Sequence, residues 1–142
     1  MSQFAQELTD FRTILVANYA NPERIAWDGE EFTPNGAWDE WLDVSHSHGG
    51  QPPDGVGGPH ALLDFGGNTL RTITADIAIL RKPGAGADAA ARTTADAILA
   101  YPWTNTDTMT YRPDEAYFGR SGIWQEVWWR QDLLMTIWRE DS

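Results

Sequence analysis

The chain has 142 residues, a length typical of one domain, and it contains no cysteine. The missing thiols exclude disulfides, thiolate zinc sites and cysteine nucleophiles. The formal net charge of −11 argues against a nucleic-acid-binding surface, because such a surface needs clustered Lys and Arg to replace the counterions of the phosphates.

The chain shows no sequence signal for a membrane or for export. No apolar run approaches the roughly 20 residues that span a bilayer. The first residues, MSQFAQELTDF, lack the basic-then-apolar order of a signal peptide. We therefore expect a single domain over residues 1–142, made in the cytoplasm, with no membrane partner.

The N-terminal segment, residues 2–20, has the apolar spacing of an amphipathic helix. Its apolar positions are Phe4, Leu8, Phe11, Leu15 and Tyr19, with Ile14 beside them. The pair Asn21-Pro22 ends the helix, because the residue before a proline is pushed out of the α region. The connector that follows contains a candidate short strand at residues 24–27, and residues 38–47 alternate as a second strand.

Glycine and proline dominate HSHGGQPPDGVGGPH, residues 46–60, which we predict to be a flexible loop. Residues 61–65 and 70–80 are predicted to form a β-hairpin around Gly66-Gly67-Asn68. The second of these strands has one apolar and one polar face, as expected for a sheet with one side in water. The apolar face is Ile73, Ala75, Ile77 and Ile79, and the polar positions are Arg71, Thr72, Thr74 and Asp76.

The break RKPGAGA, residues 81–87, is followed by a predicted helix over residues 88–100, with Asp88 as its N-cap. Its expected inner face is Ala91, Ala95, Ile98 and Leu99. Pro102 ends the helix.

The C-terminal part contains a short strand at residues 109–112 and a long apolar segment at residues 122–139. The alternating pattern of the long segment explains more apolar positions than a helical pattern does, and its aromatic and branched residues favour strands. We predict a long strand kinked near Gln131-Asp132, with a helix as the alternative. The whole chain is then an α+β domain: a mostly antiparallel sheet of about four to five strands with two helices packed on one face.

The candidate catalytic and metal-binding groups are few. His46 and His48 would project from one side of an extended segment, and His60 and Asp54 could complete a metal site if the loop folds back. Solvated loop histidines are the simpler interpretation of the same residues. Loss of thermal stability on adding EDTA would distinguish a metal site from solvated side chains.

Other motifs point away from catalysis. The glycine runs GVGG and GAGAD lack the Lys-Ser/Thr pair of a P-loop and the G-x-G-x-x-G of a dinucleotide loop. The carboxylate pairs Asp39 with Asp43, and Asp114 with Glu115, stand in polar sequence where no burial would tune their pKa values. No G-x-S-x-G elbow is present. We therefore predict that the chain is not an enzyme and has no catalytic residue, cofactor or bound metal.

Eight tryptophans are many for a chain of this size. Tryptophan is enriched at the centres of protein interfaces as well as in folding cores. The residues that we expect at contacts between subunits, or with a partner, are Trp38, Trp41, Trp124, Trp128 and Trp138. The alternative is that all tryptophans pack within the chain.

Four stretches of the sequence carry a resemblance to a known family. They are the opening helix with the passage NPERIAWDGEEFTPNGAWDEWLDV, the alternating strand LRTITADIAIL, the break and helix PGAGADAAARTTADAI, and the aromatic strand that begins GIWQEVWW. In order and pattern these stretches resemble the tail terminator proteins of long-tailed bacteriophages, also called tail completion or head–tail joining proteins. The resemblance runs from about Phe4 to Trp138, while the loop at residues 46–60 and the number of C-terminal tryptophans depart from the family.

The resemblance implies a structural virion protein at the neck end of the tail. Such a subunit assembles with copies of itself into a ring, commonly a hexamer, that caps the tail tube and stops polymerisation of the tube protein. The ring also offers a docking surface to head–tail connector proteins. DNA passes through its lumen without specific binding, which suits an acidic chain.

Two other functions remain open from the sequence. One is a different head–tail connector or assembly factor of similar shape. The other is a small metal-dependent hydrolase that uses the residues 46–60. Replacing His46 and His48 by alanine would abolish a hydrolase activity and leave a structural protein unaffected.

Overall fold

The computed structural model describes residues 3–48, 61–63, 69–103, 109–124 and 127–141. The helices are α1 (Gln3–Asn18), the 3₁₀ turn η1 (Pro22–Arg24) and α2 (Ala87–Leu99). The strands are β1 (Ile25–Trp27), β2 (Glu40–His48), β3 (Ala61–Leu63), β4 (Thr69–Arg81), β5 (Met109–Trp124) and β6 (Trp128–Asp141). None of the helices in these ranges is long and apolar enough to cross a membrane.

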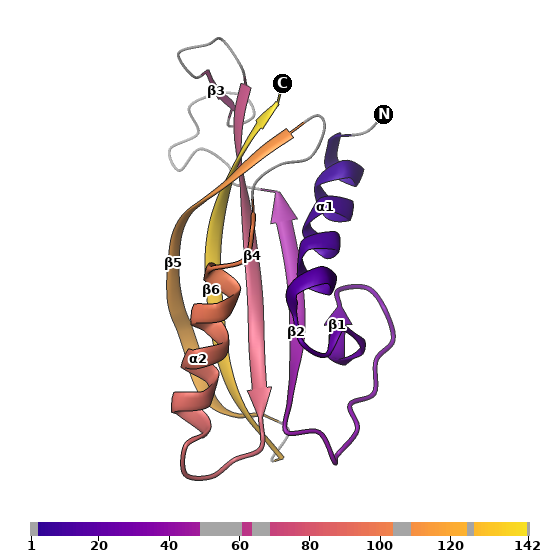
Figure 1. The fold of residues 1–142 in the computed structure, drawn as a ribbon, viewed down its shortest axis with the longest axis vertical. Helices are drawn as coiled ribbons and strands as arrows, with labels where there is room; N and C mark the ends of the chain where they lie inside the picture. Colours follow the sequence, from indigo (N-terminus) through magenta and orange to yellow (C-terminus); the bar gives the residue numbers. More distant parts are fainter. Residues whose placement is uncertain (1–2, 49–60, 64–68, 104–108, 125–126, 142) are drawn as a thin grey trace.

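One twisted sheet runs through the molecule in the order β1-β2-β4-β6-β5, and β3 pairs with β4. The β1–β2 pair is parallel and every other pair is antiparallel. Both helices lie on the same side of the sheet (Figure 1). The predicted α+β class with a mostly antiparallel sheet is therefore confirmed, with β3 as a short addition to a five-strand order.

The main core lies between the two helices and the sheet. Helix α1 contributes Phe11 and Leu15, Tyr19 follows directly after it, and α2 contributes Ala91, Ala95 and Ile98. The sheet side chains that meet them are Leu42, Val44, Ala75, Ile77, Ile79, Leu133, Met135 and Ile137. We call this side of the sheet the helix face. The small residues of α2 allow its backbone to approach the sheet closely, which a row of leucines would prevent.

Trp103 belongs to this core as well, which the sequence analysis did not anticipate. It is 2% exposed and its ring stacks on Phe11 with centroids 5.4 Å apart. Its Nε1–H donates to the carbonyl oxygen of Ile98 at 2.8 Å. Trp103 therefore adds a second donor to a carbonyl at the end of α2 that also accepts from the backbone N–H of Tyr101 at 3.1 Å.

Two helical positions differ from the prediction. The N-cap of α2 is Gly86, with φ 89°, and Asp88 instead lies in the first turn and pairs with Arg92 at 3.1 Å. A glycine is needed at this cap because a positive φ is costly for residues with a Cβ. Leu99 is 37% exposed and Leu8 is 38% exposed, so neither belongs to the buried stripe of its helix.

The strand β2 is longer than predicted at its C-terminal end. His46, Ser47 and His48 pair with Ala75, Thr74 and Ile73 of β4, so the predicted loop at residues 46–60 does not begin at His46. The long partner strand supplies hydrogen-bonding groups that override the local polar sequence. Residues 49–60 lie outside the described part of the chain.

The C-terminal segment forms a hairpin instead of one kinked strand. β5 ends at Trp124 and β6 begins at Trp128, and these two residues are Cα partners across the pair. The strand prediction is thus correct for most of residues 122–139, and the helix alternative is wrong. β6 pairs with β4 without interruption through Gln131 and Asp132, and a register shift in its pairing with β5 lies opposite these two residues. The short strand predicted at residues 109–112 is the beginning of the 16-residue β5.

Candidate functional site

The side of the sheet opposite the helices, which we call the far face, carries a second buried cluster. Trp41 of β2 is the Cα partner of Leu80 on β4, which in turn pairs with Arg130 on β6. Trp41 and Trp128 are 2% and 5% exposed, and their rings meet edge to face with centroids 5.9 Å apart. Ala78 and Leu80 are fully buried, so this half of the far face is covered. The prediction that this side of the sheet lies in water is wrong for this half.

The cover is the connector between β1 and β2, residues 28–39. Parallel strands need a crossover of about a dozen residues, and here that crossover packs over the far face. Phe32 stacks on Trp41 with centroids 5.3 Å apart and meets Trp38 at 5.9 Å. Asn35 shapes the end of the connector, since its Oδ1 accepts from the backbone N–H of Ala37 at 2.9 Å. The connector thus completes a cluster of aromatic rings.

This packing corrects the expected role of the tryptophans. The structure brings Trp38, Trp41 and Trp128 into one cluster, but two of them are buried within the chain and Trp38 is half-buried beneath Arg24. Trp138 lies ten positions along β6 from Trp128, a separation of about 33 Å at the usual rise of a strand. The backbone of Trp138 is therefore far from this cluster, whereas Trp124 is the Cα partner of Trp128. The side chains of Trp124 and Trp138 lie outside the described part, and their contacts stay a prediction.

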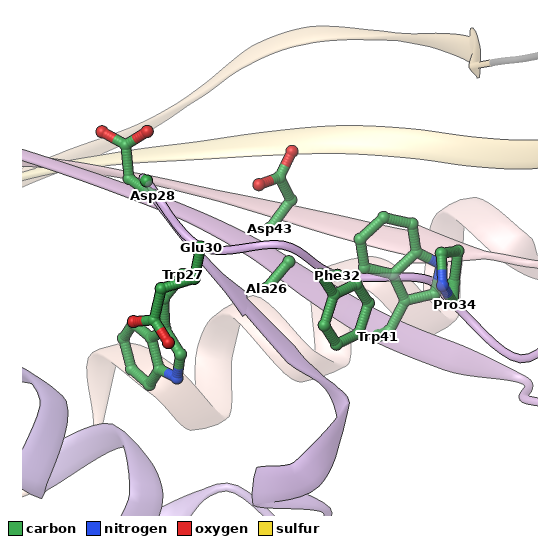
Figure 2. A pocket seen from close by; sticks show the side chains of 9 residues that line it. Ala26, Trp27, Asp28, Glu30, Phe32, Pro34, Trp41 and Asp43 are labelled. Carbon is green, nitrogen blue, oxygen red and sulfur yellow. The ribbon is translucent and has the colours of Figure 1, made fainter.

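A groove of about 290 Å³ opens beside the aromatic cluster, at the junction of β1, β2 and the connector (Figure 2). Its lining includes the apolar residues Trp27, Phe32, Pro34 and Trp41 and the acids Asp28, Glu30 and Asp43. Asp28 and Asp43 point the same way, and the rings of Phe32 and Trp41 stand together beside Pro34 (Figure 2). The volume lies near the lower bound for small-molecule sites, so the groove suits a side chain better than a large cofactor.

A small charge network lies next to this groove. Arg130 donates from Nε to Asp132 at 2.7 Å and from its guanidinium to Asp43 at 3.4 Å. Asp43, Ala78 and Asp132 are successive Cα partners across three strands. Because Ala78 has only a methyl group, Arg130 can reach over it from β6 to β2.

Two other arginines near the groove lie over tryptophan rings. Arg12 lies 4.8 Å from the ring centroid of Trp27 and pairs with Glu30 at 2.6 Å. Arg24 lies 5.3 Å from the ring centroid of Trp38 and pairs with Asp39 at 3.0 Å. Each guanidinium thus combines a cation–π contact with an ion pair.

Glu40 is the centre of a buried polar network that the sequence analysis missed. Its carboxylate accepts from Tyr19 of α1 at 2.8 Å, from Thr94 of α2 at 2.7 Å and from Arg81 of β4. Burial, together with the charge and hydrogen bond of Glu40, raises the pKa of Tyr19 far above its usual value. The sequence did contain a sign of this position. Glu40 and Leu42 are two residues apart on one strand, so their side chains lie on the same side of the sheet, the side that faces the helices.

The other predicted chemical groups do not converge in the part of the chain that can be described. Asp39 is exposed and pairs with Arg24, while Asp43 pairs with Arg130. Among the described residues, no three His, Asp or Glu side chains are placed to hold a metal ion. His60 and Asp54 lie outside these residues, as do the side chains of His46, His48, Asp114 and Glu115.

Comparison with known proteins supports the fold alone. No protein-family model and no curated protein matches the chain. One solved structure, known only by a serial identifier, has a TM-score of 0.50 at 12% identity and covers 95% of both chains. This similarity shows that the arrangement of helices and strands occurs in another protein, and it carries no functional assignment.

Proposed function

We propose that this chain is the subunit of a ring that caps the tail tube of a long-tailed bacteriophage. In this role it stops the polymerisation of the tube protein and offers a docking surface to the head–tail connector. It would act at the neck end of the virion tail, with no catalysis.

The observation that carries the proposal is that the four family-like stretches fold as one unit. They contribute α1, β4, α2 and β6, and all four elements meet in the main core through residues such as Leu15, Ile77, Ala91 and Leu133. A resemblance of order and pattern gains support when its parts share one core, because separate coincidences need not pack together.

The edge of the sheet supports assembly. β5 is the last strand in the sheet order, and no described strand pairs with its outer edge. At the tip of the β5–β6 hairpin, Ile123 is 58% exposed and Val127 is 59% exposed. A closed ring needs two different complementary surfaces on each subunit, and this hairpin supplies a candidate for one of them.

The net charge of −11 fits a conduit for DNA. A subunit that lines such a conduit must not bind the phosphate backbone, and carboxylates repel it.

A polymerisation assay tests the proposal. Tube protein of the same phage is allowed to polymerise with and without this chain, and tube lengths are measured by electron microscopy. We expect small amounts of the chain to stop growth and to sit at one end of each tube. Unchanged tube lengths with no chain bound at the ends would overturn the proposal.

A further inference from the structure

We propose that the groove between β1, β2 and the connector binds an arginine side chain of a basic partner protein. The inference goes beyond the ring-forming role and does not depend on it, because it rests on the geometry and charge of residues 26–43 and of the arginines around them.

The groove offers both halves of an arginine site. A guanidinium has a planar face that stacks on aromatic rings and five N–H groups that pair with carboxylates. Phe32 is half-buried and presents a ring at the groove, with Trp41 stacked behind it. Asp28 and Asp43 line the same groove, with Asp43 between Asp28 and these rings, and the two carboxylates point the same way (Figure 2).

The same chemistry is already used twice around the groove. Arg12 over Trp27 and Arg24 over Trp38 each combine an aromatic ring with a carboxylate of this chain. Phe32 and Asp28 both line the groove, so a ring and an acid are again present. Asp28 is exposed, and within the described part of the chain its carboxylate has no ion pair.

The charge balance favours a basic partner over a second copy of this chain. Three carboxylates line the groove, those of Asp28, Glu30 and Asp43. Arg130 pairs with Asp43 and Asp132, and Arg12 pairs with Glu30. Every arginine whose side chain is described is already paired with an acid of this chain; these are Arg12, Arg24, Arg81, Arg92 and Arg130.

The test uses the full chain and three short peptides in an NMR titration. The peptides are acetyl-Gly-Gly-Arg-Gly-Gly-amide and the same peptide with citrulline or with lysine in place of arginine. We expect the arginine peptide to shift the amide resonances of residues 26–43 with saturation. Citrulline lacks the charge and should not bind, and lysine should bind more weakly because it has no planar face.

Two variants make the test specific. Asp28→Asn removes a groove carboxylate and should weaken the arginine peptide about threefold to fivefold, the size expected for one solvent-accessible ion pair. Glu31→Gln removes the same charge from an exposed neighbour that does not line the groove, and should leave the affinity unchanged.

The contradicting outcomes are equally definite. Equal binding of the citrulline peptide, or equal weakening by both variants, would overturn the proposal. Groove resonances that shift when the protein alone is diluted would show that a second copy fills the site, and would overturn it as well.

Discussion

At the scale of single residues, Glu40 ties three parts of the fold together. Its carboxylate accepts from Tyr19 just after α1, from Arg81 of β4 and from Thr94 of α2. Removing a charge from such a network leaves its partners buried without their acceptor, which costs more than the net value of the interaction.

The variant Glu40→Gln tests this network. It keeps the volume but loses the charge that opposes Arg81, and we expect the free energy of unfolding to fall by about 2 kcal/mol. This is less than for a fully buried pair because Arg81 remains 23% exposed along its side chain. Urea denaturation followed by circular dichroism measures the change. Glu31→Gln, on the exposed connector, is the control and should stay within about 0.5 kcal/mol; an equal loss in both variants would refute the role of Glu40.

The pKa of Tyr19 predicts loss of stability at alkaline pH. Burial and Glu40 raise this pKa above the ordinary tyrosine value of 10.0, so at alkaline pH the folded chain holds a proton that the unfolded chain releases. The stabilising contribution is therefore complete below about pH 10 and declines as pH rises, by at most about 1.4 kcal/mol per pH unit.

The variant Tyr19→Phe separates this effect from general alkaline unfolding. It removes the titrating group, so its unfolding free energy should fall less steeply between pH 9 and pH 11 than that of the unchanged chain. It should also be about 1 kcal/mol less stable at neutral pH, because Glu40 loses one donor. Parallel pH profiles of the two proteins would contradict the assignment.

At the scale of the elements, α2 depends on small residues where it meets the sheet. Ala91 and Ala95 are 0% and 1% exposed, and the side chains of β4 and β6 lie beneath them. A larger residue at either position must push the helix away or force side chains out of their preferred rotamers.

The pair Ala95→Leu and Ala97→Leu tests the close approach of α2. The first substitution should destabilise the fold by about 1–3 kcal/mol, while the second, at an exposed position on the same helix, should be nearly neutral. Thermal unfolding of the two variants measures the difference. Equal melting temperatures would mean that α2 does not need small residues here.

The sequence predicted those elements whose apolar pattern is local. The two α-helices show clear helical spacing and β4 shows clear alternating spacing. The structure contains all three elements nearly as expected. β5 was missed over most of its length because Pro113, Gly119 and Gly122 disfavour a strand, and its pairing with β6 decides the outcome. Two register shifts, between Pro113 and Glu115 and between Phe118 and Ser121, accommodate these residues.

The groove was less predictable than the fold. Sequence patterns identified Trp38, Trp41 and Trp128 as a set, but could not show that the connector residue Phe32 covers them. The crossover of residues 28–39 has no periodic pattern, so its position over the far face follows only from the parallel pairing of β1 with β2. The acids Asp28 and Asp43 come together for the same reason.

At the scale of the whole molecule, two ends of the sheet have different characters. The termini and β3 lie at one end, while the β5–β6 hairpin tip and the loop between β4 and α2 lie at the other (Figure 1). The hairpin tip exposes Ile123 and Val127, which an isolated subunit gains nothing by exposing.

The double variant Ile123→Lys with Val127→Lys tests whether this tip makes a contact between subunits. We expect it to weaken assembly at least tenfold in concentration while its melting temperature changes little, since both side chains are exposed. Val16→Lys on α1, at a position 46% exposed, is the matched control. Sedimentation velocity measures both proteins, and equal assembly of the two would exclude the tip as a contact.

The central claim is that this chain forms a ring on a tail tube. Light scattering coupled to size exclusion, over a wide range of protein concentrations and with or without tube protein, tests it most directly. The claim predicts a discrete oligomer of defined mass, formed either at high concentration or on the tube protein. A strict monomer at every concentration, with no binding to tube protein, would contradict it.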